Sequence, residues 1–152
     1  MTTPRRVLAA VLIASLGAAA CGGTDTDTQS DPVGSAAVES AVAPGIQVVS
    51  PEQAAATIAD GSDDLVILDV RTPEEFDDGH IEGAVMLDFN RDDFAEQLST
   101  FDPEVPYVMY CQSGNRSSGA RAIMSELGFT SVEDIDGGIV GWEQAGLPTT
   151  SG

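Results

Sequence analysis

Short apolar runs alternate with helix-start signals along most of this 152-residue chain, and this alternation most constrains its fold. Residues 65–68 read Leu-Val-Ile-Leu between acidic residues, and residues 107–110 read Tyr-Val-Met-Tyr directly before Cys111. Apolar runs of this length are typical of strands covered on both faces. Residues 50–53 (Ser-Pro-Glu-Gln) and 72–75 (Thr-Pro-Glu-Glu) each have the pattern of a capping box with proline at the first helical position. The alternation predicts an α/β fold with a mostly parallel central sheet and helices on both faces.

Residues 45–152 are expected to form one domain, because a chain of this length supports a single modest core. The predicted strands cover residues 46–49, 65–68, 84–87 and 107–110. The predicted helices cover residues 51–59, 92–98 and 116–127, and a further helix starts at residue 73. Ligands of parallel sheets bind beyond the carboxyl ends of the strands. Cys111 follows a predicted strand directly and is therefore the first candidate for a functional residue.

The charge and the supply of metal-binding residues exclude several functions. The chain has 25 Asp and Glu residues against six arginines and no lysine, which gives a net charge of -19. Nucleic acids and anionic lipid headgroups bind basic surfaces, so we expect no nucleic-acid partner. The chain has one histidine, His80, and two cysteines, Cys21 and Cys111. These are too few for a zinc site with nitrogen and sulfur ligands or for a disulfide framework, and we expect no metal.

The first 21 residues have the pattern of an export signal. Arg5 and Arg6 precede an uncharged apolar run over residues 7–20, as in the basic and hydrophobic regions of a signal peptide. The run of about 14 residues is shorter than the roughly 20 that a membrane-spanning helix needs. We therefore expect cleavage and export, with an uncleaved anchor as an alternative. The two arginines are compatible with either general or twin-arginine export.

The end of the signal resembles the lipobox of bacterial lipoproteins, in which small residues precede the cysteine that is cleaved and diacylated. Three alanines stand before Cys21, and Ala18 takes the position where leucine is usual. The resemblance implies a lipid anchor at Cys21 in the cell envelope, facing outside the cytoplasm, and no other membrane contact; simple secretion is the alternative. Residues 22–44 are rich in Gly, Thr, Ser, Asp and Ala, which predicts a flexible linker spanning about 25 to 30 Å.

The segment after the fourth predicted strand has the composition of an anion-binding loop. Residues 111–116 read Cys-Gln-Ser-Gly-Asn-Arg and lead into a predicted helix. Free amides and the dipole at a helix N-terminus favour an anion, so the thiolate of Cys111 should be stabilised. Gly114 permits the positive φ that a tight loop needs. The candidate binding residues are the five that follow the cysteine, namely Gln112, Ser113, Gly114, Asn115 and Arg116.

The acidic surface opposes an anion at Cys111, and magnitudes decide which effect is larger. An exposed acid about 15 Å away contributes roughly 0.3 kcal/mol in water before screening. Arg116 within about 5 Å, at an effective dielectric constant near 20, contributes roughly 3 kcal/mol before desolvation. We expect the local attraction to dominate, and the surface charge to slow the approach of anionic substrates.

Three segments together resemble the rhodanese domain family, although each alone is a weak signal. The match runs over residues 46–148. The matching segments are Leu-Asp-Val-Arg at 68–71 with Pro-Glu-Glu-Phe at 73–76 and Gly-His-Ile-Glu-Gly-Ala at 79–84, the loop at 111–116, and Gly-Gly at 137–138 through Trp142 to Gly-Leu-Pro at 146–148.

The resemblance implies a single rhodanese-like domain with sulfurtransferase chemistry. Cys111 would attack a sulfane sulfur and carry it as a persulfide, which a second nucleophile then removes. The implied donor is thiosulfate or a similar sulfur-containing anion, and the implied acceptor is cyanide or a thiol. Loop amides from Gln112 to Arg116 would hold the anionic sulfur, with Arg116 binding the donor's oxyanion. No metal or organic cofactor is implied.

Asp69 and Arg71 end a central strand on the side of Cys111, so we expect them to support the site. The favoured role is a structural charge network with Glu75 under the loop, and the alternative is direct substrate contact. His80 falls in a segment that the resemblance assigns to the scaffold, so we expect it to be structural rather than a general base. Trp142 is expected to anchor the core.

The sequence is also compatible with other functions of Cys111. A phosphatase is one, because related folds hydrolyse phosphate esters with a Cys-to-Arg loop. Those loops place five residues between cysteine and arginine, whereas four separate Cys111 from Arg116 here. Others are a non-catalytic persulfide carrier, a redox sensor, a protein-binding module or an inert buried cysteine. No oligomeric state is predicted.

Overall fold

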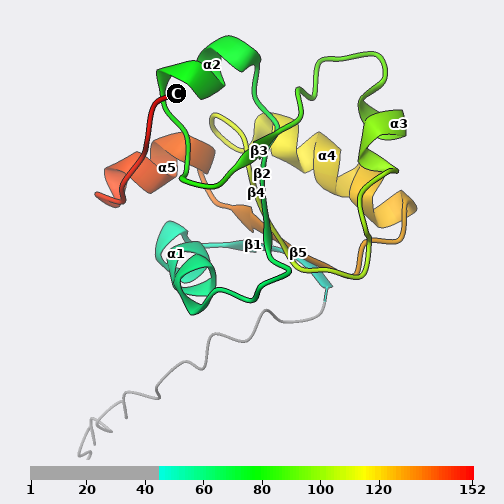
Figure 1. Ribbon diagram of the computed structural model, residues 1–152, viewed down its shortest axis with the longest axis horizontal. Helices are drawn as coiled ribbons and strands as arrows, with labels where there is room; N and C mark the ends of the chain where they lie inside the picture. Colours follow the sequence, from blue (N-terminus) through cyan, green and yellow to red (C-terminus); the bar gives the residue numbers. More distant parts are fainter. Residues whose placement is uncertain (1–44) are drawn as a thin grey trace, which may run out of the picture. The chain divides into compact units, whose positions relative to one another are not determined.

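Parallel strands in the order β1-β5-β4-β2-β3 form the central sheet (Figure 1). The computed structural model describes residues 45–152, so the predicted signal, Cys21 and the linker at 22–44 lie outside the described residues. The strands are β1 (Gly45–Val49), β2 (Val66–Asp69), β3 (Val85–Met86), β4 (Tyr107–Tyr110) and β5 (Ser131–Ile135). The helices are α1 (Pro51–Asp60), α2 (Pro73–Asp78), α3 (Phe94–Leu98), α4 (Asn115–Glu126) and α5 (Gly138–Gln144).

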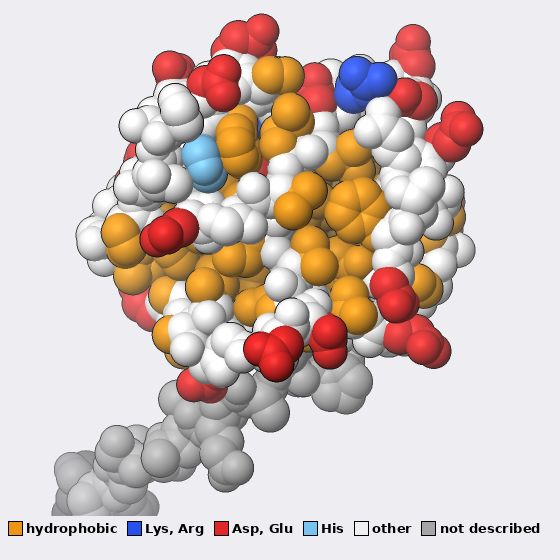
Figure 2. Space-filling model, in the orientation of Figure 1, with side chains coloured by type: hydrophobic (Ala, Val, Ile, Leu, Met, Phe, Trp, Pro, Cys, Tyr) orange, Lys and Arg blue, Asp and Glu red, His pale blue; other side chains and the backbone are white. Residues whose placement is uncertain are grey.

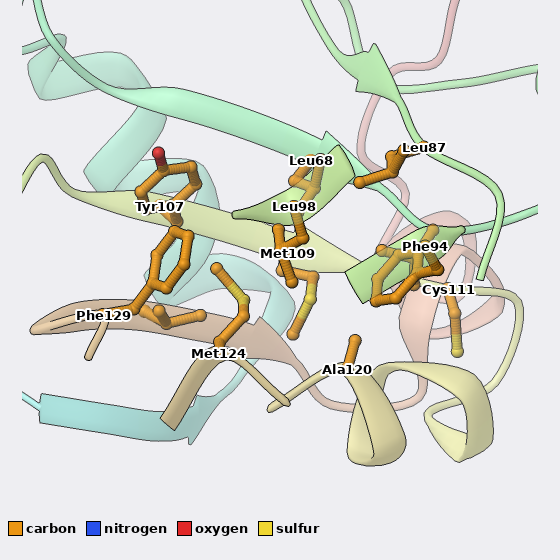
Figure 3. Close-up of a cluster of buried hydrophobic side chains, with 12 residues drawn as sticks. Leu68, Leu87, Phe94, Leu98, Tyr107, Met109, Cys111, Ala120, Met124 and Phe129 are labelled. Carbon is orange, nitrogen blue, oxygen red and sulfur yellow. The ribbon is translucent and has the colours of Figure 1, made fainter. Parts of the chain in front are cut away.

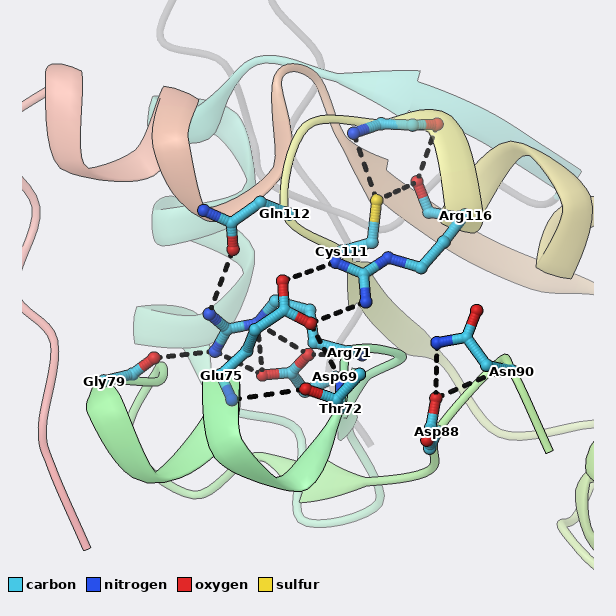
Figure 4. A network of polar contacts seen from close by, with 12 residues as sticks. Asp69, Arg71, Thr72, Glu75, Gly79, Asp88, Asn90, Cys111, Gln112 and Arg116 are labelled. Atoms are coloured by element: carbon cyan, nitrogen blue, oxygen red, sulfur yellow. Dashed lines mark hydrogen bonds and ion pairs between the residues drawn. The ribbon is translucent and has the colours of Figure 1, made fainter.

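Two helices begin at capping boxes, as the sequence predicts. The Gln53 N–H donates to Ser50 Oγ at 3.3 Å, and the Ser50 N–H donates to Gln53 Oε1 at 3.1 Å. The same reciprocal pair joins Thr72 and Glu75, at 3.4 and 3.0 Å. These bonds satisfy N–H groups that have no partner inside the helix. The second box also fixes the Glu75 carboxylate, which faces the cysteine loop (Figure 4).

The sheet separates two apolar layers, so helices cover both of its faces. On one face, Leu68 and Met109 pack with residues of α3 and α4, including Phe94 and Met124 (Figure 3). Neighbouring strand residues point the other way, because side chains alternate along a strand. On that second face the sheet packs against α1 and α5 through Ile67, Val108, Tyr110, Ala54, Ile139 and Trp142. The predicted two-sided burial of the central strands is confirmed.

Strand β5 and helix α5 were not predicted as elements. β5 reads Ser-Val-Glu-Asp-Ile, and Glu133 and Asp134 are 5% and 2% exposed. Acidic residues are depleted in strands and seldom fully buried, so the sequence pattern gave no strand signal there. Asp134 is held by an ion pair with Arg121 of α4 at 3.0 Å. The tertiary pairing of β5 between β1 and β4 overrides the weak local preference.

The carboxyl ends of β2 and β4 lie side by side. Asp69 pairs with Tyr110 in the register of these two strands, so Arg71 and Cys111 leave the sheet at the same edge. Trp142 is 3% exposed, and its indole N–H donates to the Pro148 carbonyl at 2.8 Å, which fits the predicted core role. None of the helices in residues 45–152 is both long and apolar enough to cross a bilayer.

Candidate active site

The sulfur of Cys111 sits at the N-terminus of α4 (Figure 4). The residue at the N-cap, Gly114, has φ 96° and offers no side chain to bond the first amides of the helix. Instead its own N–H donates to Cys111 Sγ at 3.1 Å. Only glycine adopts this backbone conformation readily. The sulfur thus takes the place that a Ser or Asp side chain usually has at a helix start.

Opposing effects set the pKa of the Cys111 thiol. Burial raises it, since the residue is only 1% exposed. The backbone N–H and hydroxyl of Ser117, together with the N–H groups of Ser113 and Gly114, act in the opposite direction. The result is a pKa below the ordinary value of a thiol. Hydrogen bonds to the charged form therefore outweigh desolvation, as the loop composition predicts.

Ser117 belongs to the site, although the sequence reasoning did not select it. The Cys111 thiol donates to Ser117 Oγ at 3.6 Å, and the hydroxyl donates to the Gly114 carbonyl at 3.2 Å. Ser117 is fully buried, on the same face of α4 as Ala120 and Met124. The signal that could have identified Ser117 is its position, because a residue with a hydroxyl group there begins a row of otherwise apolar residues on one face of the helix.

Arg116 forms a two-point ion pair with Glu75 of α2. Both of its terminal nitrogens lie 2.6 Å from a carboxylate oxygen. Hydrogen bonding to Arg116 lowers the pKa of Glu75 to about 2, against the effect of burial. The positive charge expected to act on the thiolate is therefore shared with a carboxylate. The role of Arg116 in binding a donor's oxyanion stays a prediction.

Asp69 and Arg71 form a buried ion pair beside the loop. Arg71 Nη2 lies 2.7 Å from Asp69 Oδ2, and the same nitrogen donates to the Gly79 carbonyl at 2.6 Å. Arg71 Nη1 donates to Gln112 Oε1 at 3.4 Å. Desolvation disfavours the charged guanidinium, but Asp69 outweighs it and the pKa of Arg71 is raised. This pair contacts the residue after the nucleophile and not the sulfur itself.

The start of α5 holds the loop backbone from the other side. The Ile139 N–H donates to the Cys111 carbonyl at 2.8 Å, and the Val140 N–H donates to the Gln112 carbonyl at 3.2 Å. A Cβ on Gly138 would overlap the Cys111 carbonyl oxygen and lie 2.8 Å from the Gln112 carbonyl carbon. Gly138, the second glycine of the Gly-Gly motif, is thus required by a close approach of two backbones.

The remaining predicted residues lie around this centre. Ser113 and Asn115 are exposed, at the tip of the loop and at the first position of α4. His80 stacks on Phe76 at 3.7 Å, and its Nδ1 lies 2.9 Å from the Phe76 carbonyl oxygen, which agrees with a scaffold role. Within residues 45–152, no group of three His, Cys, Asp or Glu side chains is arranged to hold a metal ion.

A cavity of about 190 Å³ opens beside the loop, between α2 and α5. Its lining residues come from three parts of the chain. Arg71, Glu75, Asp78 and Gly79 follow β2, Gln112 belongs to the cysteine loop, and Ile139 and Glu143 belong to α5. Gln112 directly follows Cys111 in the chain, but Cys111 itself does not line the cavity. The cavity has the size for a small molecule or for one side chain of a larger one.

Fold and loop together define a class of protein, an α/β domain that presents a cysteine of lowered pKa at a helix N-terminus. The chain belongs to the rhodanese-like domain family, whose pattern matches residues 50–145. It is 45% identical over 92 residues to thiosulfate sulfurtransferase 16, chloroplastic, of Arabidopsis thaliana, covering 54% of this chain and 77% of that protein. It is 38% identical over 94 residues to thiosulfate sulfurtransferase GlpE of Pseudomonas entomophila, covering 62% and 82%.

A solved structure agrees with the fold. The polysulfide-sulfur transferase homodimer of Wolinella succinogenes superposes with a TM-score of 0.59 at 26% identity, covering 70% of this chain and 80% of that one. The prediction of a single rhodanese-like α/β domain is therefore confirmed. The relatives place the chain among sulfurtransferases as a family.

Proposed function

We propose that this protein is a sulfurtransferase in which Cys111 carries a sulfane sulfur as a persulfide. The observation that carries the proposal is the sulfur of Cys111, which accepts the Gly114 N–H at 3.1 Å and adjoins the Ser117 hydroxyl. The Gly114 N–H donates to the sulfur, and the Ser117 hydroxyl, which accepts from the thiol, can donate to it once the thiol is ionised. Both groups favour an anionic sulfur, which is both the attacking nucleophile and the charged end of the persulfide. The proposed donor is thiosulfate or a similar anion, and the acceptor is cyanide or a thiol.

The reaction has two transfer steps. The Cys111 thiolate attacks the outer sulfur of thiosulfate, a bond forms between the two sulfurs, and sulfite leaves with the electron pair of the broken bond. The acceptor then attacks the outer sulfur of the persulfide, and the electron pair of that bond returns to Cys111. Loop groups from Gln112 to Arg116 bind the anions in both steps.

Intact-mass measurement tests the proposal directly. The chain carrying Cys21→Ser has Cys111 as its single thiol. Reduced protein is incubated with thiosulfate and then with cyanide, beside a second chain that also carries Cys111→Ser. We expect a gain of one sulfur atom by the first protein only, followed by its loss to cyanide with release of thiocyanate. A reduced and alkylatable Cys111 that never gains sulfur would reject thiosulfate transfer.

The same protein separates the other candidate functions. Hydrolysis of an aryl phosphate that depends on Cys111 would support the phosphatase reading, against which the four-residue spacing to Arg116 argues. A persulfide that forms but is not released to cyanide or small thiols would support a carrier role. Stable sulfenylation by peroxide with no sulfur uptake would support a redox sensor.

We also propose that the protein is exported and anchored to the cell membrane through a lipid on Cys21. The arginines and apolar run before this cysteine support the proposal. Fractionation of cells expressing the chain should place it in the membrane fraction, with a diacylated N-terminal Cys21 by mass spectrometry. The Cys21→Ser chain should lose that modification. An unmodified cysteine in a membrane-bound chain would indicate an uncleaved anchor instead.

A further inference from the structure

Stabilisation of the Cys111 thiolate depends on neutral donors, because the cations of the domain already have partners. Residues 45–152 contain no lysine, and each of their four arginines forms an ion pair with a carboxylate: Arg71 with Asp69, Arg91 with Asp93, Arg116 with Glu75 and Arg121 with Asp134. Figure 2 shows the same imbalance at the surface, where acidic side chains are spread around the visible face and basic ones are few. The direction in which each neutral donor points therefore decides how well the sulfur holds a negative charge.

One of these donors can turn, and the others cannot. The N–H groups of Ser113, Gly114 and Ser117 are fixed by the backbone, whereas the Ser117 hydroxyl rotates and carries a single proton. In the structure the hydroxyl donates this proton to the Gly114 carbonyl oxygen at 3.2 Å and accepts from the Cys111 thiol at 3.6 Å. Once Cys111 is ionised, its sulfur competes with the carbonyl oxygen for the same proton.

A buried carboxylate, that of Asp134, is directed at this hydroxyl. Asp134 is 2% exposed and shares a face of β5 with Val132, which packs in the same apolar layer as α4, because side chains alternate along a strand. Ser117 and Arg121 are one turn apart on the side of α4 that meets β5, and Arg121 Nε lies 3.0 Å from Asp134 Oδ2. Burial raises the pKa of Asp134, and the nearby Ser117 hydroxyl acts against this effect.

The second oxygen of the carboxylate lacks a donor. Asp134 Oδ1 is buried and has no hydrogen-bond partner within residues 45–152. The charged groups that act on the carboxyl are Arg121 from α4 and Asp136 beyond the end of β5. Its neighbours in the sheet, Val48 of β1 and Met109 of β4, are apolar. A buried oxygen without a partner is a strong acceptor for any proton that can turn toward it.

The protonation state of Asp134 thus decides where the hydroxyl proton of Ser117 goes. An ionised Asp134 attracts that proton and competes with the thiolate of Cys111. A protonated Asp134 instead donates to Ser117 Oγ and leaves the hydroxyl proton to the sulfur. The direct repulsion between two negative groups acts in the same direction, since it also weakens when Asp134 is protonated.

We infer that Asp134 is a positioning residue of the site, which sets through the Ser117 hydroxyl how strongly the Cys111 thiolate is stabilised. Asp134 takes no part in the transfer itself, and no proton passes between it and the cysteine. The inference rests on the proposed function for what the thiolate does, but ionisation of the thiol is measurable without sulfur transfer. By linkage, the thiolate in turn favours the protonated form of Asp134, so the two groups titrate as a coupled pair.

A double-mutant cycle on the pKa of Cys111 tests the inference. Four full-length proteins carry Cys21→Ser, which leaves Cys111 as the single thiol, and are made with and without Ser117→Ala and Asp134→Asn. Asparagine imitates the protonated acid here. Since Arg121 can only donate, the amide oxygen turns to Arg121 and the amide N–H groups to Ser117 Oγ. The pH dependence of iodoacetamide alkylation gives the pKa in each protein.

We expect Asp134→Asn to lower the pKa of Cys111 by about 1 unit when Ser117 is present, as one additional hydrogen bond to a charged sulfur would. In the Ser117→Ala protein the same substitution should lower it by about half as much, because only the change of charge beside Arg121 remains. Asp136→Asn is the matched control. It removes an exposed carboxylate that also acts on Asp134, and the pKa of Cys111 should change by less than about 0.2 unit.

The difference between the two backgrounds decides the inference. A drop that is larger by about 0.5 unit with Ser117 than without it supports the inference. Equal drops would show that the charge of Asp134 acts on the sulfur directly, and no drop in either background would show that the groups are not coupled; both results overturn the inference. Coupling in a protein that forms no persulfide would reject the proposed function alone, and a persulfide without coupling would reject the inference alone.

Titration of the Asp134 carboxyl carbon by NMR examines the same coupling without a change at position 134. Ser117→Ala should raise the pKa of Asp134 further above its ordinary value, because the hydroxyl that lowers it is lost. Ser118→Ala, at an exposed neighbouring position, should leave it unchanged. Equal pKa values of Asp134 in these two variants would overturn the inference even if Asp134→Asn does not fold.

Discussion

Arg116 and Glu75 hold each other by two contacts of 2.6 Å directly beside the Cys111 loop (Figure 4). Glu75 also accepts the Thr72 N–H, so the ion pair is tied to the start of α2. Arg116 is the arginine nearest to Cys111 in sequence, and its charge is thereby neutralised by a carboxylate of α2. Stabilisation of the thiolate falls mainly to neutral hydrogen-bond donors, namely the amides of the loop and the side chain of Ser117.

Replacing Glu75 by Gln should leave Arg116 without its carboxylate partner, so that its positive charge acts more strongly on the Cys111 thiolate. We expect the pKa of Cys111 to fall by about 0.5 to 1 unit, because an unpaired cation then lies nearby. The amide oxygen of Gln can still accept the Thr72 N–H, so the helix start is preserved. Loss of this partly exposed pair should cost no more than about 1 kcal/mol of unfolding free energy. The pH dependence of iodoacetamide alkylation measures the change, with exposed Glu74→Gln as control; an unchanged midpoint would contradict it.

Replacing Ser117 by Ala should raise the pKa of Cys111. The hydroxyl is one of the groups that lower it, and a hydrogen bond to a charged sulfur contributes about 1.5 kcal/mol, equivalent to roughly one pKa unit. The thiolate absorbance near 240 nm as a function of pH reports the shift. Ser118→Ala, at an exposed neighbouring position, should leave the titration unchanged. Equal titrations of the Ser117 and Ser118 variants would show that the Ser117 hydroxyl does not lower the pKa of Cys111.

Asp134 should make stability fall as the pH rises through the mildly acidic range. Burial raises its pKa to about 6, above the ordinary value of 3.8, although Ser117 and Arg121 act against this. The folded state therefore binds a proton between pH 4 and 6 that the unfolded state has released, so stability decreases with pH there. The shift corresponds to roughly 2 to 3 kcal/mol by pH 7.

Urea denaturation at a series of pH values checks this effect. The unfolding free energy of the unmodified protein relative to Asp134→Asn should decline from pH 4 to pH 7. A parallel series with Asp77→Asn, exposed on α2, supplies the comparison. A slope for Asp134→Asn no different from that of Asp77→Asn would show that Asp134 is ionised normally.

Gly138→Ala should damage the loop far more than Gly146→Ala. Both glycines have positive φ, 59° and 73°, so alanine costs about 1 to 2 kcal/mol of backbone strain at either position. A Cβ at Gly138 also meets the Cys111 carbonyl, whereas nothing lies within 4 Å at Gly146. We expect an additional loss of roughly 2 kcal/mol and a lower persulfide yield for Gly138→Ala only. Denaturation and intact mass test this, and equal behaviour of the two variants would refute the close approach.

The strands and helices that the sequence predicted are those with strong local signals. The capping boxes before α1 and α2 and the apolar runs of β2 and β4 depend on neighbouring residues alone, and each appears within a residue or two of its expected place. β5 has no such signal, because Glu133 and Asp134 are buried in it. Its burial depends on Arg121 and on the strands beside it, which no local pattern records.

The sequence by itself determined the fold class, the family and the placing of Cys111 between a strand and a helix start. These follow from local periodicity, from capping chemistry and from a loop whose residues are contiguous. Only the tertiary structure decided that Glu75 forms an ion pair with Arg116. It also decided that Gly138 lets the backbone of α5 approach the Cys111 carbonyl, and that Asp78 and Glu143 line the same cavity. These contacts join residues far apart in the chain, and their geometry is set by how helices pack across the carboxyl edge of the sheet.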